Sequence, residues 1–96
     1  MKIDYNKIND TLNISLDGRL DTITAPEFED FLELNLIGVK SITLNCEKLV
    51  YISSAGLRVL LSLNKKMKNS MKLVNMQELV MGVLEVTGFA NILEIK

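Results

Sequence analysis

The stretch "LVYISSAGLRVLL", residues 49–61, places two serines, an alanine and a glycine between two aliphatic blocks. Before it, residues 42–47 alternate apolar and polar side chains, which is typical of a strand with one buried face. After it, apolar residues recur at helical spacing as far as Met67. The stretch therefore predicts a strand that ends near Leu49–Tyr51, a short loop, and a helix that begins near Ala55.

The two serines supply one more hydroxyl group than a helix start requires. Either Ser53 or Ser54 can act as the N-cap and accept a hydrogen bond from a first-turn amide. Gly56 lowers helix propensity by about 1 kcal/mol relative to alanine, so we expect another group to approach its backbone closely. A helix N-terminus also accommodates a phosphate, which adds about −1.5 to −2 charge. The residues alone leave two interpretations open: a serine that only caps the helix, and a serine that is regulated or faces a ligand.

The N-terminal part of the chain predicts a hairpin followed by a helix. Apolar and polar residues alternate from Ile3 and again from Leu12, with "NDT" as the turn between them, and Gly18 is expected to end the second strand. In "TAPEFEDFLELN", Thr24 is the expected N-cap, and Glu27 three residues later completes a capping box. The apolar face of this helix is expected to pack on the sheet.

The C-terminal part predicts a strand, a helix and a last edge strand. The strand is "MKLV", residues 71–74, and Asn75 with Glu78 forms a second capping-box pattern. The helix ends near Gly88, and residues 90–95 can supply the edge strand. The whole pattern predicts an α/β fold, with a mixed β-sheet of four to five strands, an N-terminal β-hairpin, and helices packed against the sheet through right-handed crossovers.

Composition narrows the classes of function. We expect residues 1–96 to form a single domain, because a second domain would have too little apolar surface. Eleven basic and twelve acidic side chains give a formal charge of −1, without the concentrated positive face that nucleic acid binding requires. No segment approaches the roughly 20 apolar residues of a membrane span. We therefore expect a cytoplasmic protein that binds neither nucleic acid nor membrane.

The chain has no histidine and one cysteine. The absence of histidine excludes a Ser-His-Asp triad, and a single cysteine excludes an internal disulfide and argues against a zinc site. Cys46 alternates with polar neighbours, so we interpret it as a buried small hydrophobic residue rather than a reactive thiol. We expect no metal and no cofactor.

Three segments together resemble the STAS domain, and specifically the bacterial anti-sigma factor antagonists. "ITLNCEKLVYISSAGLRVLLSLNKKMK" is similar to the family signature, in which an aliphatic strand leads into Asp-Ser-Ser/Ala/Thr-Gly-Leu and an apolar helix. "LDGRLDTITAPEFED" resembles the Gly-x-Leu/Ile-Asp marker that follows the second strand, and "VTGFANILEI" resembles the family's ending. The resemblance covers nearly the whole chain and implies the STAS fold.

The resemblance also implies which residues form the site. The family's phosphoacceptor falls on Ser54, and the usual aspartate directly before it is replaced by Ser53, which is therefore an alternative acceptor. The family's other aspartate falls on Asp21, which either contacts the partner or caps its own loop. The residues expected to bind the partner are Asp21, Thr22, Ile23, Thr24, Ser53, Ala55, Gly56, Leu57 and Arg58.

The mechanism that the resemblance implies is a partner switch. The unmodified protein would bind an anti-sigma factor that is also a serine kinase of the GHKL type, and would free a sigma factor. The kinase would phosphorylate Ser54 with ATP and magnesium and lose affinity for the product, and a serine phosphatase would restore binding. The domain would be a substrate and ligand, not an enzyme, and a monomer or weak dimer.

Three alternatives remain. A STAS domain can instead be a scaffold or regulatory subunit of a stressosome-like signalling complex or a lipid-transport complex, because fold does not determine function. A serine hydrolase would need a base other than histidine, and "YISSAGL" lacks the Gly-x-Ser-x-Gly elbow. Nucleotide binding by the domain itself would lack a glycine-rich phosphate loop.

Overall fold

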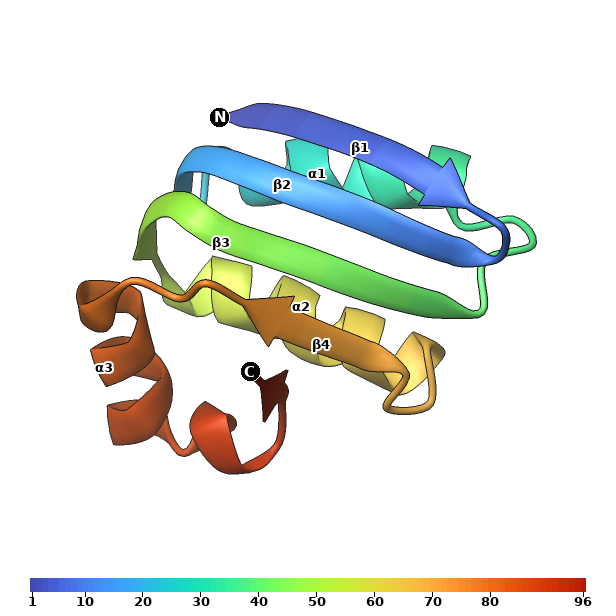
Figure 1. Cartoon of the computed structure of the whole chain (residues 1–96). Coiled ribbons are helices and arrows are strands. Elements are labelled where there is room, and N and C mark those ends of the chain that lie inside the picture. Colours follow the sequence, from blue (N-terminus) through green and yellow to red (C-terminus); the bar gives the residue numbers. More distant parts are fainter.

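The computed structural model describes residues 1–96 and contains five strands, three α-helices and one short 3₁₀ helix (Figure 1). In chain order they are β1 (Lys2–Ile8), β2 (Thr11–Leu20), α1 (Ala25–Asn35), β3 (Ser41–Ile52), α2 (Ser54–Lys66), β4 (Met71–Val74), α3 (Glu78–Thr87), η1 (Phe89–Asn91) and β5 (Glu94–Ile95). The predicted order of strands and helices is confirmed, including the final edge strand, which has only two residues.

The strands form one mixed sheet in the order β1-β2-β3-β4-β5. β1 and β2 are antiparallel, and the turn between them uses Asn9 at φ +57°, a conformation that asparagine tolerates better than most residues. β2, β3, β4 and β5 are parallel neighbours, which requires a crossover between each pair. The predicted mixed sheet with an N-terminal hairpin is therefore confirmed.

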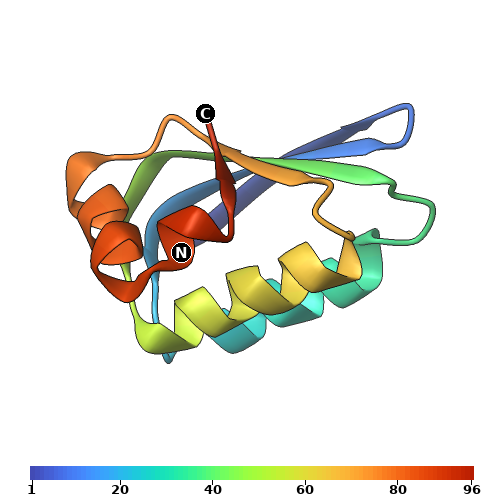
Figure 2. The ribbon, with the colours of Figure 1, turned by 90° about the horizontal axis from the view of Figure 1, so that it is seen from below.

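The helices α1 and α2 lie side by side beneath one face of the sheet (Figure 2). Figure 1 views the sheet from its other face, which no helix covers, and α3 lies beyond the ends of β3 and β4. Because all parallel strands point the same way, β2 and β3 end at the same side of the sheet, where α1 and α2 begin. At 13 residues, α2 is the longest helix, well short of the roughly 20 residues that crossing a bilayer takes.

The core lies between the sheet and the helices. Alternate residues of β2 and β3 point toward the helices, as their pattern predicted, and Cys46 is among them. Burial raises the pKa of the Cys46 thiol to about 12, which confirms a packing role rather than a reactive one. The fully buried large side chains are Phe28, Leu12, Ile14, Leu16, Leu20, Ile42, Leu44, Leu49, Leu60, Leu63, Met71 and Leu73.

Both predicted capping boxes are wrong. Thr24 occupies the N-cap position of α1, but its hydroxyl donates to the carbonyl of Arg19 at 2.7 Å and accepts from the amide of Asp21 at 2.9 Å. Asn75 does not cap α3, because its side-chain amide donates to the side-chain oxygen of Asn45 at 3.1 Å. At Thr24 the hydroxyl is engaged by the backbone just before it, and at Asn75 a contact from β3 replaces the local hydrogen bond.

Two predicted strand ends are also corrected. β2 continues past Gly18 to Leu20, because Gly18 adopts φ +115° at an irregularity in the pairing with β3 and the ladder resumes after it. β3 ends at Ile52 rather than between Leu49 and Tyr51, because Ile52 still pairs with Leu20. β2 and β3 therefore end together, at Leu20 and Ile52, and Ser53 follows directly after β3.

Gly56 lies in the first turn of α2 and faces the end of β2. A Cβ at this position would stand 2.7 Å from the carbonyl oxygen of Leu20 and 2.9 Å from Cγ1 of Ile52. The expected close approach to this backbone is confirmed, and the approaching atoms belong to the protein's own strands.

Replacing Gly56 with alanine is expected to destabilise the protein by about 1–3 kcal/mol, because α2 has to move away from Leu20. The matched control is Gly82→Ala in α3, where a Cβ would meet no atom within 4 Å. That control should gain about 0.5–1 kcal/mol from helix propensity. Urea unfolding measures both variants, and equal stability of the two would contradict the contact at Gly56.

Candidate functional site

The loop between β3 and α2 gives its two serines different roles. Ser53 is extended, with φ −103° and ψ 177°, and its hydroxyl accepts a hydrogen bond from the amide of Gly56 at 3.4 Å. Ser53 is therefore the N-cap of α2. Ser54 is the first residue of the helix, it is exposed, and its hydroxyl has no hydrogen-bond partner within the protein. The free hydroxyl belongs to Ser54.

The backbone of Ser53 is held by the neighbouring strand. Its amide donates to the carbonyl of Leu20, the last residue of β2, at 3.0 Å. The helix then closes with the amide of Leu57 donating to the carbonyl of Ser53 at 2.9 Å. These bonds tie the serine loop to the end of β2, so the loop between β2 and α1 lies beside it.

Asp21 organises that neighbouring loop. One carboxylate oxygen accepts from the amide of Ile23 at 3.0 Å and from the amide of Thr24 at 3.1 Å. The hydrogen bond from the amide of Thr24 is the main cause that lowers the pKa of Asp21 below its ordinary value of 3.8. Hydrogen bonds from Ile23 and Arg19 lower this pKa further, whereas partial desolvation raises it. Its side chain is 22% exposed. Of the two roles predicted for Asp21, the structure shows the capping one.

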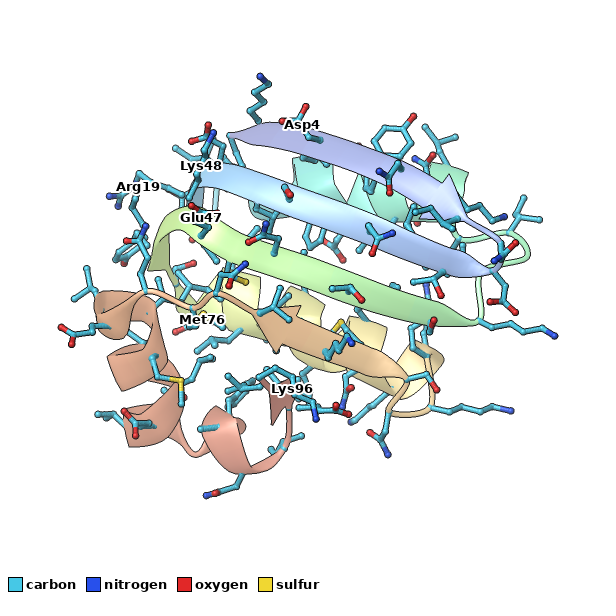
Figure 3. The ribbon with its side chains drawn as sticks, in the orientation of Figure 1. Asp4, Arg19, Glu47, Lys48, Met76 and Lys96 are labelled. Carbon is cyan, nitrogen blue, oxygen red and sulfur yellow. The ribbon has the colours of Figure 1, made fainter.

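Arg19 connects the ends of the two central strands. Its Nε lies 3.4 Å from a carboxylate oxygen of Asp21, and its guanidinium lies 4.1 Å from the ring centroid of Tyr51 in β3, a cation–π geometry. Figure 3 labels Arg19 at the side of the sheet where β2 and β3 end. The pairing of Arg19 with Tyr51 was not predicted from the sequence, because only the register of β2 on β3 brings them together.

The structure brings the predicted partner-binding residues together at one end of the sheet. Ile23 stands out among them, with 85% of its surface exposed. Gly56 and Leu57 are buried and support the loop from inside, so their role in partner binding stays a prediction. The remaining residues, together with Ser54, form what we call the serine-loop surface: Asp21, Thr22, Ile23, Thr24, Ser53, Ser54, Ala55 and Arg58.

A shallow hollow lies between the first turns of α1 and α2. Its polar lining comes from Thr22, Glu29, Arg58 and Ser62, and its apolar lining includes Ala55. No group of three or more acidic, cysteine or histidine side chains converges here or elsewhere in the structure. The hollow therefore offers hydrogen bonds and opposite charges rather than a set of metal ligands.

Comparison with known proteins identifies the family. The family model described as "STAS domain" matches residues 2–96. The chain is 32% identical over 96 residues to BtrV of Bordetella bronchiseptica, a protein named as a candidate anti-sigma factor antagonist, and the match covers 96% of this chain and 83% of BtrV. This chain is a STAS domain protein of the anti-sigma factor antagonist family. The resemblance predicted from its sequence motifs is thereby confirmed.

Solved structures show that the STAS fold is shared at lower identity. A Thermotoga maritima protein, described as a candidate anti-sigma factor antagonist, superposes with a TM-score of 0.88 at 23% identity and covers 97% of this chain and 84% of its own. The Bacillus cell fate determinant SpoIIAA in its phosphorylated form superposes with a TM-score of 0.74 at 18% identity, over 99% of this chain and 91% of its own. The predicted fold class is confirmed.

The N-cap role of Ser53 explains the departure from the family pattern. Aspartate and serine are nearly equivalent N-caps, since either side-chain oxygen accepts a hydrogen bond from a first-turn amide. The residue before Ser54 can therefore change from aspartate to serine while the start of α2 stays in place.

Removing the charge of Asp21 should make the stability of the protein less dependent on pH in the acidic range. Because its pKa is lowered in the folded state, Asp21 stabilises the protein above pH 3.8, and this contribution is lost as the pH falls through the folded-state pKa. Asp21→Asn should therefore melt below the wild type at neutral pH, and the gap should close in acid. The control is Asp17→Asn, an exposed carboxylate outside the three ion pairs; a gap of equal size there would contradict the assignment.

Replacing Ser53 with alanine should cost about 1 kcal/mol of stability through loss of the N-cap, whereas Ser53→Asp should stay close to the wild type. Ser54→Ala is the matched control, because the Ser54 hydroxyl has no partner to lose. Urea denaturation followed by circular dichroism gives the three stabilities. If Ser54→Ala lost as much stability as Ser53→Ala, Ser53 would not be the N-cap.

Proposed function

We propose that this STAS domain is a phosphorylation-switched anti-sigma factor antagonist whose acceptor is Ser54. In the unmodified state the serine-loop surface binds an anti-sigma factor that is also a serine kinase, and a sigma factor is released. The observation that carries the proposal is the exposed hydroxyl of Ser54, free of any internal hydrogen bond, at the first position of α2.

Ser54 suits a kinase better than Ser53 does. The hydroxyl of Ser53 is engaged with the amide of Gly56, so phosphorylation there would remove the helix cap. A phosphate on Ser54 would instead stand at the positive end of the helix dipole, near first-turn amides. The acceptor can therefore be modified while the fold that carries it is retained.

The switch acts through charge rather than shape. The chain has a formal charge of −1, and a phosphate adds about −1.5 to −2 to it at one point of the serine-loop surface. A partner that buries this point has to desolvate the phosphate and meets a changed potential, which weakens binding. The fold similarity to the phosphorylated form of SpoIIAA supports the compatibility of this fold with a phosphate.

The remaining partners follow from the family rather than from the geometry. We propose a GHKL-type serine kinase, which supplies ATP and magnesium, and a serine phosphatase that returns the protein to its binding form. The domain is then the substrate and the ligand, it needs no cofactor, and it acts in the cytoplasm as a single unit, monomeric or weakly dimeric. The chain has no histidine for a conventional serine hydrolase.

The test compares Ser54→Ala and Ser54→Asp with the wild type. Ser54→Ala should bind the kinase and gain no phosphate mass, whereas Ser54→Asp should stay folded and bind roughly tenfold or more weakly. Intact-protein mass spectrometry after incubation with the cognate kinase and ATP measures phosphorylation, and calorimetry measures binding. Ser53→Ala is the control that should still accept phosphate.

Equal affinity of the wild type and Ser54→Asp would rule out the switch. If no phosphate mass appeared with the cognate kinase, and the chain copurified with a transporter or stressosome subunit, the protein would be a STAS module of another complex. Ester turnover that disappeared in Ser54→Ala would indicate a hydrolase.

A further inference from the structure

Arg58 lies one helical turn after Ser54 and is not engaged by the protein. Its side chain is exposed, it takes part in none of the three ion pairs, and no side-chain hydrogen bond involves it. Residues four apart in a helix lie on the same face, with Cβ atoms roughly 5–6 Å from one another. The guanidinium of Arg58 can therefore reach a group attached to the Ser54 hydroxyl.

No charged group around Arg58 forms an ion pair with its guanidinium. Glu29 of α1 lines the same hollow, but the two side chains form no ion pair within 4.0 Å. Asp21, in the adjoining loop, is engaged with Arg19 and with its own loop amides. Within α2 the other basic residues are Lys65 and Lys66 in the last turn, far along the helix from Ser54. Arg58 is thus the cation placed to meet a phosphate on Ser54.

We propose that phosphorylation of Ser54 draws Arg58 into an ion pair within α2. This inference rests on the proposed function, since it takes Ser54 as the modified residue. A phosphate presents three acceptor oxygens, and a guanidinium can bind two of them at once. The anion precedes the cation by four residues, which is the favourable order along a helix.

The ion pair gives the modification a double effect on the serine-loop surface. In the unmodified protein this surface carries the exposed positive charge of Arg58 and an uncharged Ser54. In the phosphorylated protein the negative group is added and the guanidinium is turned toward it, so a partner that meets Arg58 loses that contact. One covalent change therefore removes an attractive charge and introduces a repulsive one.

The test places phosphoserine at position 54 by genetic encoding, so that no kinase is needed, and follows the phosphate by ³¹P NMR against pH. The second pKa of the phosphoserine should be lower in the wild type than in Arg58→Gln by roughly 0.15–0.4 pKa units, because the guanidinium favours the dianion. The phosphoserine pKa in Arg58→Lys should lie between these two values, because lysine keeps the positive charge but cannot form a bidentate hydrogen bond. Lys66→Gln is the control with the same change of net charge.

An unchanged phosphoserine pKa in Arg58→Gln would overturn the ion pair. So would a rise in Lys66→Gln as large as that in Arg58→Gln, since net charge alone would then explain both. These results do not depend on the proposed function. A cognate kinase that left Ser54 unmodified would refute the proposed function and leave the titration unaffected.

Discussion

The carbonyl of Leu20 holds the serine loop in place. It accepts a hydrogen bond from the amide of Ser53 at 3.0 Å and stands 2.7 Å from the position that a Cβ on Gly56 would take. Only glycine lets the first turn of α2 lie this close to the end of β2. Because Ser54 lies between these two contacts, its backbone is fixed and its side chain is directed away from the strands. The Ser54 hydroxyl is therefore exposed on a rigid support.

The loop between β2 and α1 is also held by a few specific contacts. Asp21 orders its own loop through the amides of Ile23 and Thr24, and Arg19 links it to Tyr51 on the next strand. A surface ordered in advance loses little conformational entropy when a partner binds. Under the proposed function, a phosphate on Ser54 would act on such a surface mainly through its charge. The serine-loop surface is thus held by internal hydrogen bonds and carries the free hydroxyl of Ser54.

Much of the fold could be predicted from periodicity, because alternating and helical patterns report which side chains face the core. The burial of Cys46 followed in the same way. The end of α3 near Gly88 followed instead from the frequent use of glycine at helix C-termini. The predicted capping boxes at Thr24 and Asn75 were wrong for different reasons. The Thr24 hydroxyl bonds to the backbone just before it, whereas the Asn75 side chain bonds to Asn45 on a strand 30 residues away. The predicted ends of β2 and β3 were also wrong, because pairing between these strands continues as far as Leu20 and Ile52.

Residue spacing and motifs were sufficient to predict the order of strands and helices, the family, and a helix start with two candidate serines. These are local properties, because each can be read from a short stretch of sequence without knowing which segments pack against it. Pairing between β2 and β3 carries β3 to Ile52, so that Ser53 caps α2 and Ser54 stays free. Packing of distant segments also places Gly56 against β2 and Arg19 on Tyr51. The reason is physical: hydrogen bonds and steric contacts between segments distant in the chain exist only after the parallel strands have paired.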